Sequence, residues 1–324
     1  MVFEHKASLI LIVCLALLLS CSSGGGPEKK SVRLQVVATI FPVYDFARKI
    51  GGDKVAVTML IPPGTDAHHF ELKPSDIVMV SKSDIFLFTS FEMEQWAYKV
   101  INAAAEKTNM LAVETGQGTS LLPWSSSHGH DDADHETASP ENDLHHSAKF
   151  DPHIWLDFDN ARKMVDNIST AFINKDPKNS EYYKKNAKDY KLKLTDLDKK
   201  YKAQISHCQT RTILHAGHWA FAYLAERYQL AYVSAYNMSA DAEPTPLQIL
   251  TLIREVKKQK LRHIYYEDMV APKLAKTVAE ETGAALIKLT NGHDVSKDEI
   301  QSGVSFITLM ERNLENLKKG MLCP

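Results

Sequence analysis

The segment Asp151-Pro152-His153-Ile154-Trp155-Leu156-Asp157 sets a single histidine between a proline and three bulky apolar residues. Proline restricts the backbone just before the histidine, and the apolar residues after it are expected to anchor the chain. A histidine held from both sides is typical of a fixed ligand. The sequence therefore predicts that His153 binds a metal ion, and the rest of the chain is interpreted from this segment outward.

The segment before this histidine is rich in side chains that bind metal. Five histidines and six carboxylates lie between His128 and His146, and no Lys or Arg occurs between Lys107 and Lys149. Such a composition is typical of a solvent-exposed segment that binds soft divalent metal ions. Residues 116–149 show little periodicity and are expected to form a mobile loop. The loop either raises the local zinc concentration or senses zinc, or it is an insert without function.

The N-terminus has the features of an export signal. Residues 9–19 form an unbroken apolar run, which is too short to span a bilayer of ~30 Å but fits the core of a secretory signal. Leu18-Leu19-Ser20-Cys21 resembles a bacterial lipobox, with a plain signal peptide as the alternative. We expect residues 1–20 to be a lipoprotein signal peptide, Cys21 to be lipidated, and 21–33 to be a flexible tether. The protein would then be extracytoplasmic, anchored by lipid to a bacterial membrane.

Charge and cysteine content add two expectations. The formal net charge of -2 gives no reason to expect nucleic acid as a partner. Once Cys14 and Cys21 are assigned to the signal peptide and the lipid anchor, Cys208 and Cys323 remain. A disulfide between these two cysteines is the simplest proposal for an oxidising compartment, and two free buried thiols are the alternative.

The chain from residue 34 onward predicts two α/β lobes. A length of 324 residues exceeds what one hydrophobic core usually supports, and apolar runs alternate with helical patterns in both halves, as in parallel sheets covered by helices. Between the halves, residues 180–205 contain no Gly or Pro and predict a helix of roughly 39 Å. The expected parts are an N-terminal lobe, a helical linker and spine, and a C-terminal lobe, at residues 34–158, 159–205 and 206–324.

The expected strands divide equally between the two lobes. Those of the first lobe are residues 34–40, 55–60, 85–88 and 110–113. Those of the second lobe are residues 212–215, 230–234, 263–266 and 285–289.

Three histidines occupy equivalent places in this scheme. His68 follows the second strand, His153 ends the long loop, and His218 follows the first strand of the second lobe. Ligands of such sheets collect at the carboxyl ends of strands, and imidazole is the commonest biological ligand for zinc. His215 and His218 lack the intervening glutamate of a zincin motif, so His215 is expected to be a packing residue at the end of its strand.

Three segments resemble one protein family. Residues 64–71, 151–157 and 218–228 are similar to the zinc/manganese-type solute-binding proteins of bacterial ABC transporters (ZnuA-like), and the resemblance covers about residues 34–319. It implies two small α/β lobes joined by one long rigid helix, with metal held in the cleft between them by His68, His153 and His218. Ala67 stands where the family usually has proline, so a register with His69 as the ligand is an alternative.

The fourth ligand departs from the family pattern. The family often places an aspartate just after the last strand, where this chain reads Leu289-Thr290-Asn291-Gly292-His293-Asp294. Neither Thr290 nor Asn291 is a first-choice zinc ligand. We expect His293 to be the fourth ligand, with Asp294, Glu267 or a water molecule as alternatives.

These residues favour a role in zinc transport, in which no covalent bond is made or broken. A site of three or four histidines suits Zn²⁺, whereas Mn²⁺ prefers carboxylate oxygens. The predicted function is that of a monomeric, non-enzymatic, high-affinity zinc-binding component of an ABC-type import system, which delivers the ion to a membrane permease. Zinc affinity is expected to fall as the pH drops through about 6. The alternatives are a manganese- or iron-binding homologue, a secreted zinc hydrolase and a surface adhesin.

Overall fold

The computed structural model describes residues 33–68, 70–105, 109–124, 149–234, 245–267 and 272–324. The predicted signal peptide, Cys21, most of the tether, His69 and the histidine-rich segment 128–146 lie outside these residues. Among the described helices, none combines the length and the apolar character that crossing a membrane requires.

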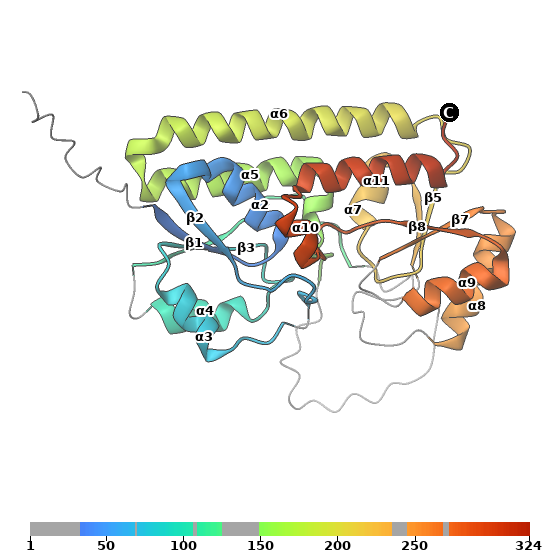
Figure 1. Cartoon of the computed structure of the whole chain (residues 1–324), viewed down its shortest axis with the longest axis horizontal. Coiled ribbons are helices and arrows are strands. Elements are labelled where there is room, and N and C mark those ends of the chain that lie inside the picture. The colour runs from blue at the N-terminus through green and yellow to red at the C-terminus, as the bar shows by residue number, and fades with distance from the viewer. Residues whose placement is uncertain (1–32, 69, 106–108, 125–148, 235–244, 268–271) are drawn as a thin grey trace, which may run out of the picture. The chain divides into compact units, whose positions relative to one another are not determined.

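The first sheet contains four parallel strands in the order β2-β1-β3-β4. Successive residues of a strand point to opposite faces, and both faces of this sheet are covered. On one face, Val36 and Ile85 pack in the core shared with α2 and α5. On the other face, Val37 and Phe86 pack against α3 and α4, which lie beneath the sheet in Figure 1. The strands are β1 (Leu34–Ala38), β2 (Val55–Met59), β3 (Ile85–Phe88) and β4 (Leu111–Glu114), and the helices are α2 (Phe41–Gly51), α3 (Pro74–Ser81), α4 (Ala97–Ala105) and α5 (Phe158–Lys175).

The second sheet repeats this arrangement in the order β6-β5-β7-β8, again with all strands parallel. Leu214 and Ile264 pack on one face in a core shared with α8 and α9. On the opposite face, Tyr265 and Ile287 join the larger core that contains α11. The strands are β5 (Thr212–His215), β6 (Ala231–Ser234), β7 (His263–Tyr266) and β8 (Ala285–Lys288), and the helices are α7 (Ala222–Tyr228), α8 (Pro246–Lys258), α9 (Pro272–Thr282), α10 (Lys297–Gln301) and α11 (Phe306–Gly320).

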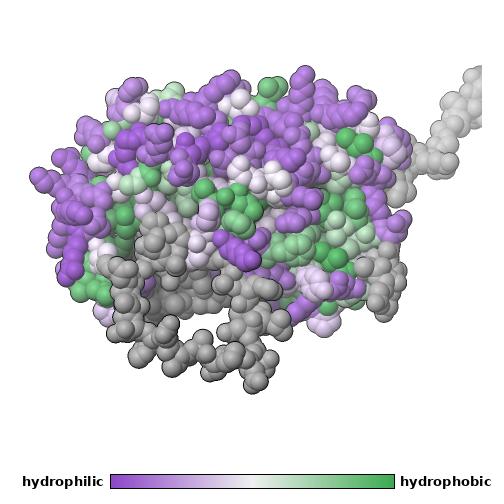
Figure 2. Space-filling model, turned by 180° about the vertical axis from the view of Figure 1, so that it is seen from behind, coloured by the Kyte–Doolittle hydropathy of each residue, from purple (hydrophilic) through white to green (hydrophobic). Residues whose placement is uncertain are grey.

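Helix α6 (Ser180–Ile205) runs past helices of both sheets, as Figure 1 shows. Its buried side chains recur at helical spacing, so one stripe faces the core, and Figure 2 shows hydrophilic residues along its outer side. Two tyrosines fix it to its neighbours: Tyr190 donates a hydrogen bond to Asp45 on α2, and Tyr201 donates one to the carbonyl of Met310 on α11. The predicted fold class, two parallel α/β sheets joined by one long helix, is confirmed.

One apolar cluster contains residues of both sheets and of α6. Two separate cores were expected from the length of the chain, but the inner faces of the two sheets share this cluster along α5, α6 and α11. Together the described residues from Arg33 onward form a single compact unit. The two lobes are thus held together by apolar burial, independently of any metal.

The ends of the expected long loop are packed against the rest of the protein. Trp124 donates a backbone hydrogen bond to Lys149, and Pro123 forms an isolated bridge with Phe150. Ser120 exchanges two hydrogen bonds with the side chain of Asn160 on α5. The expectation of a mobile loop over all of 116–149 is therefore too broad, because its ends find backbone and amide partners that periodicity does not reveal.

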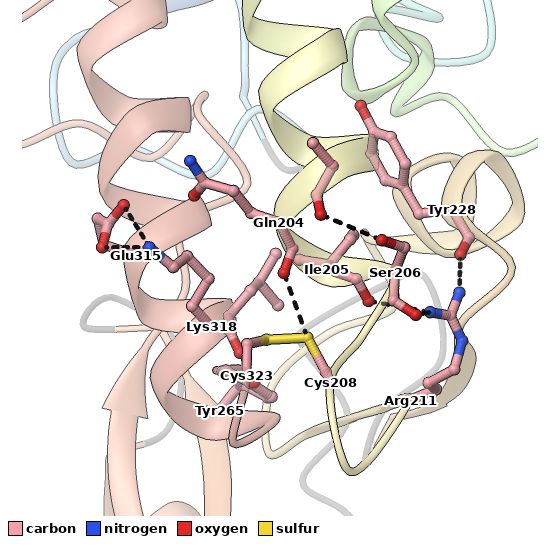
Figure 3. Close-up of a disulfide and its surroundings, with 12 residues drawn as sticks. Gln204, Ile205, Ser206, Cys208, Arg211, Tyr228, Tyr265, Glu315, Lys318 and Cys323 are labelled. Carbon is pink, nitrogen blue, oxygen red and sulfur yellow. Dashed lines mark hydrogen bonds and ion pairs between the residues drawn. A yellow bond between two sulfur atoms is a disulfide. The ribbon is translucent and has the colours of Figure 1, made fainter.

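The structure joins Cys208 to Cys323 by a disulfide, drawn in Figure 3. Cys208 follows α6, and Cys323 follows α11, so the bond links the ends of the two helices. Backbone hydrogen bonds from Gln209 and Thr210 to Leu322 and Met321 run beside it.

Removing this disulfide is expected to lower stability without changing metal binding. The bond closes a loop of 115 residues, and loss of a bridge of this kind costs about 2–5 kcal/mol. Chemical denaturation of Cys208→Ser/Cys323→Ser should show this decrease in the unfolding free energy. The zinc affinity of this variant should equal that of the wild type. A loss of affinity that accompanies the loss of stability would contradict a purely structural role.

Candidate metal centre

Four loops, three of which follow strands, bring four histidines together. His68 follows β2, His153 precedes the short 3-10 turn Ile154–Leu156, His218 follows β5 and His293 follows β8. One ring nitrogen from each histidine lies within 4.8 Å of the nitrogens of the other three. The structure therefore assembles all four histidines that the sequence selects, two from each side of the molecule.

The spacing of the four rings is close to tetrahedral. The six distances between ring centroids all lie between 5.2 and 6.0 Å, and in a regular tetrahedron all six are equal. The Nε2 atom of His153 lies 3.3 Å from that of His68 and 3.4 Å from that of His218. Zinc bonds of about 2.0–2.1 Å place tetrahedral nitrogens about 3.3–3.4 Å apart. These two separations match the geometry of zinc.

The Nε2 atom of His293 supplies a second test of the site. It is buried and has no hydrogen-bond partner among the described residues. An unpaired polar atom in the interior costs about 1–3 kcal/mol. A metal ion shared with the other three imidazoles would remove this cost, so the donor set fits a bound cation.

Carboxylates hold the far side of these rings. The Nδ1 atom of His153 lies 2.9 Å from Asp151, and that of His218 lies 2.8 Å from Glu267. The Nδ1 atom of His293 lies 3.0 Å from Asp294. In His153 and His218 this hydrogen bond fixes the tautomer and the ring orientation, and it leaves Nε2 for the metal. Nδ1 of His293 is close to Asp294 but has no hydrogen-bond partner among the described residues.

His68 is held through its backbone. Its N–H donates to the side chain of Asp66 at 2.9 Å. Of the four ligand candidates, only His68 is not fully buried, which makes it the histidine nearest to solvent.

Asn291 organises the fourth loop, although the sequence indicated only that it is not a ligand. Its Oδ1 accepts hydrogen bonds from the backbone N–H groups of His293 and Asp294. Its Nδ2 donates to both Glu267 and Asp294, at 2.7 and 3.0 Å. One amide thus connects the carboxylates behind two candidate ligands. The signal that could have found it is the Asn-Gly pair directly before His293, since asparagine commonly bonds to the backbone two residues on.

Burial and neighbouring charge divide the histidines into two classes. Burial, reinforced by the nearby histidines, lowers the pKa of His68 to about 3 and holds that of His153 well below its ordinary value. Burial also opposes the charged form of His218, but the carboxylate of Glu267 outweighs it and raises the pKa to about 9. At neutral pH the metal-free site therefore holds a proton on His218, while His68 and His153 are neutral.

The segment Asp151–Asp157 also contacts the second lobe without any metal. The indole N–H of Trp155 donates to the carbonyl of Asn291 at 2.8 Å, in the loop that carries His293. Trp219 and Tyr223 donate to the side chain and the carbonyl of Asp151. These bonds help to fix the ligand loops of the two lobes relative to one another.

His215 lies outside the cluster, as its packing role predicts. It ends β5, is fully buried, and its Nδ1 lies 3.2 Å from the carbonyl of His218. Burial lowers its pKa to about 4. His215 therefore supports the turn that presents His218 and does not itself face the other ligands.

Comparison with known proteins agrees with this geometry. The chain is 33% identical over 320 residues to the "High-affinity zinc uptake system protein ZnuA" of Bacillus subtilis, with 97% of this chain and 96% of that protein covered. It is 32% identical over 315 residues to the "Zinc-binding lipoprotein AdcA" of Streptococcus pneumoniae. This alignment covers 97% of the chain but only 60% of AdcA.

A solved structure and a family model cover the same region. The Zn(II)-bound ZnuA-like domain of Streptococcus pneumoniae AdcA superposes with a TM-score of 0.74 at 29% identity, covering 90% of this chain and 99% of that domain. The family model described as "Zinc-uptake complex component A periplasmic" matches residues 36–320. This protein therefore belongs to the ZnuA family of periplasmic zinc-uptake components.

Proposed function

We propose that this protein is the extracytoplasmic zinc-binding component of an ABC-type importer. It captures Zn²⁺ through His68, His153, His218 and His293 and delivers the ion to a membrane permease. The near-equal spacing of the four imidazoles, three of them buried, supports this function most directly. His293 is the fourth ligand in this proposal, because Glu267 and Asp294 contact the Nδ1 atoms of other histidines or of His293 itself.

The donor set and the surrounding charge favour zinc. Imidazole nitrogens suit Zn²⁺, whereas Mn²⁺ prefers carboxylate and carbonyl oxygens. Burial opposes ionisation of Asp294, but positive charge beside it, at His293 and His218, outweighs burial and lowers its pKa. A bound dication would take the place of that positive charge next to Asp294 and Glu267.

The same geometry argues against a zinc hydrolase. A catalytic zinc keeps one coordination position open for water or substrate, and four imidazoles would close the coordination sphere. The family role is that of a solute-binding protein. In this proposal the protein carries zinc from one place to another and catalyses no reaction.

Anchoring and domain limits belong to the same proposal. Lipidation of Cys21 after removal of residues 1–20 would tether the protein outside the cytoplasm, and a close relative carries the name lipoprotein. The lobes at 34–158 and 206–324 act with the helical part 159–205 as one monomeric carrier.

Zinc uptake in the native host tests this function. A strain without its own copy should regain growth in chelator-treated medium, and radioactive zinc uptake, when it carries the wild-type chain. His218→Ala should fail to restore either, whereas His207→Ala, an exposed histidine on the turn after α6, should restore both. Full uptake with His218→Ala at equal protein level would refute the proposed carrier site.

A further inference from the structure

We infer that Arg227 is a positioning residue for the zinc site: by clamping Asp157 it holds His153 at its metal-binding distance from His218. The inference rests on the proposed function, and it concerns residues that touch neither the histidine rings nor the ion. It assigns a role to the last residue of the segment Asp151–Asp157 and to a basic side chain on α7.

The guanidinium of Arg227 joins three parts of the chain. Its Nε and one terminal nitrogen donate to the two carboxylate oxygens of Asp198 on α6, at 2.8 and 2.7 Å. The other terminal nitrogen donates to Asp157 and to Asp159, at 2.8 Å each. The fork of donors on arginine suits such a bidentate arrangement, which lysine cannot reproduce.

Asp157 fixes the first ligand segment. One of its oxygens accepts hydrogen bonds from the N–H groups of Asp159 and Asn160, so it caps the N-terminus of α5, and the other oxygen receives Arg227. The chain from His153 to Asp157 is one buried 3-10 turn, Ile154–Leu156. Backbone bonds close this turn from Leu156 to His153 and from Asp157 to Ile154, both at 3.2 Å. Holding Asp157 therefore holds His153.

Arg227 is fixed in the same way to the second ligand segment. It lies on α7 (Ala222–Tyr228), and His218 lies just before that helix. The backbone between them is held by the bond from Ala220 to the hydroxyl of Tyr232, at 3.0 Å. The Asp157–Arg227 pair thus links the same two segments as the His153–His218 pair, and it needs no metal.

Burial identifies which contacts of Arg227 matter. The side chains of Arg227, Asp198 and Asp157 are 9%, 8% and 19% exposed, but that of Asp159 is 65% exposed. Burial opposes ionisation of Asp198, yet bonds from Arg227 and Lys202 lower its pKa to about 2. Exposed ion pairs contribute little, whereas partly buried bidentate pairs keep their strength.

The consequence is a site that is ordered before zinc arrives. Without the clamp, zinc binding would have to order the His153 turn, and the free energy of ordering would be subtracted from affinity. With it, the Nε2 atoms of His153 and His218 are held 3.4 Å apart, a separation that suits two ligands of one zinc ion. This predicts an effect on metal binding that exceeds the effect on folding.

Asp157→Asn tests the inference with the helix cap retained. Asparagine caps helices as well as aspartate does, so this variant keeps the cap oxygen but replaces the charged oxygen that accepts from Arg227 with an amide NH2, which cannot accept. Zinc affinity is expected to fall about tenfold, the lower end of the effect that is typical when a residue supporting a metal ligand is lost. Substitution with Co²⁺ should show a weaker visible absorption band than in the wild type, because tetrahedral coordination is less strictly imposed.

Asp159→Asn is the matched control. It removes a carboxylate at the same 2.8 Å from the same nitrogen of Arg227, but one that solvent screens, so wild-type affinity and Co²⁺ absorption are expected. Arg227→Lys is a second disabling variant and should behave like Asp157→Asn. A purely structural role would instead lower the unfolding free energy of metal-free Asp157→Asn and leave affinity and spectrum unchanged.

The results separate this inference from the proposed function. Wild-type zinc affinity and Co²⁺ absorption in Asp157→Asn, or equal losses in Asp157→Asn and Asp159→Asn, would overturn the positioning role. Failure of the wild-type chain itself to bind zinc would instead overturn the proposed function.

Discussion

Replacing His153 with alanine is expected to weaken zinc binding by more than about a hundredfold. Loss of a residue that only supports a ligand costs about 10–100-fold in affinity, and His153 is placed to be a ligand itself. Its Nε2 is the one that lies within 3.4 Å of both His68 and His218. Without His153, zinc would have three imidazole ligands, and the nitrogen that lies closest to those of both His68 and His218 would be missing.

Competition with a chromophoric zinc chelator measures this effect. His207→Ala is the control, because it removes an imidazole that is exposed and lies outside the cluster. Circular dichroism should show the same helix content in both variants. Zinc affinity in His153→Ala within a factor of a few of the wild type would remove His153 from the ligand set.

Glu267→Gln is expected to change how zinc affinity depends on pH. In the metal-free wild type, Glu267 raises the pKa of His218 to about 9, so zinc must displace a proton from this ring below that pH. Each unit of pH lost should therefore weaken binding about tenfold, or about a hundredfold between pH 8 and 6. His68 and His153 add nothing to this slope, because their pKa values are lowered far below it. The sequence alone placed the decline near pH 6, and Glu267 moves it upward.

A neutral glutamine cannot stabilise the imidazolium of His218. Burial then lowers the pKa of that ring, and the affinity of Glu267→Gln should fall less steeply than that of the wild type between pH 8 and 6. Glu299→Gln is the control, because Glu299 lines the same cavity as Glu267 but pairs with Arg312 and Ser296. Competition with a zinc chelator at pH 6, 7 and 8 measures the zinc affinity of the wild type and of both variants. Equal slopes for the wild type and Glu267→Gln would show that this carboxylate does not control the proton.

The sequence predicts the strands and the long helix well because their signals are local. The limits of β3, β5, β7 and α6 agree residue for residue with the apolar runs and the uninterrupted helical pattern. The ends of other strands are less accurate. The first strand was expected to reach residue 40, but β1 ends at Ala38, because Ile40 is already the N-cap of α2. The last strand was expected to reach residue 289, but β8 ends at Lys288.

In the site, too, residues that lie in short sequence patterns could be predicted, and residues that act through partners far along the chain could not. Motifs selected His68, His153 and His218, and His293 was expected from its place after the last strand, where the chain departs from the family pattern. Asn291 and Arg227 were not selected. The Asn-Gly pair could have shown the local bonds of Asn291 to His293 and Asp294, but not its bond to Glu267, 24 residues away. Arg227 lies 70 residues from Asp157. No periodicity or spacing rule connects such pairs before the chain is folded.

The central claim is that one zinc ion is held by four imidazoles from both lobes. Crystals of the zinc-loaded protein, measured with anomalous scattering at the zinc absorption edge, test it most directly. The expected result is a single zinc peak about 2.0–2.1 Å from the Nε2 atoms of His68, His153, His218 and His293. A zinc peak bound instead by the oxygens of Glu267 and Asp294, or one that lies away from these histidines, would contradict the account.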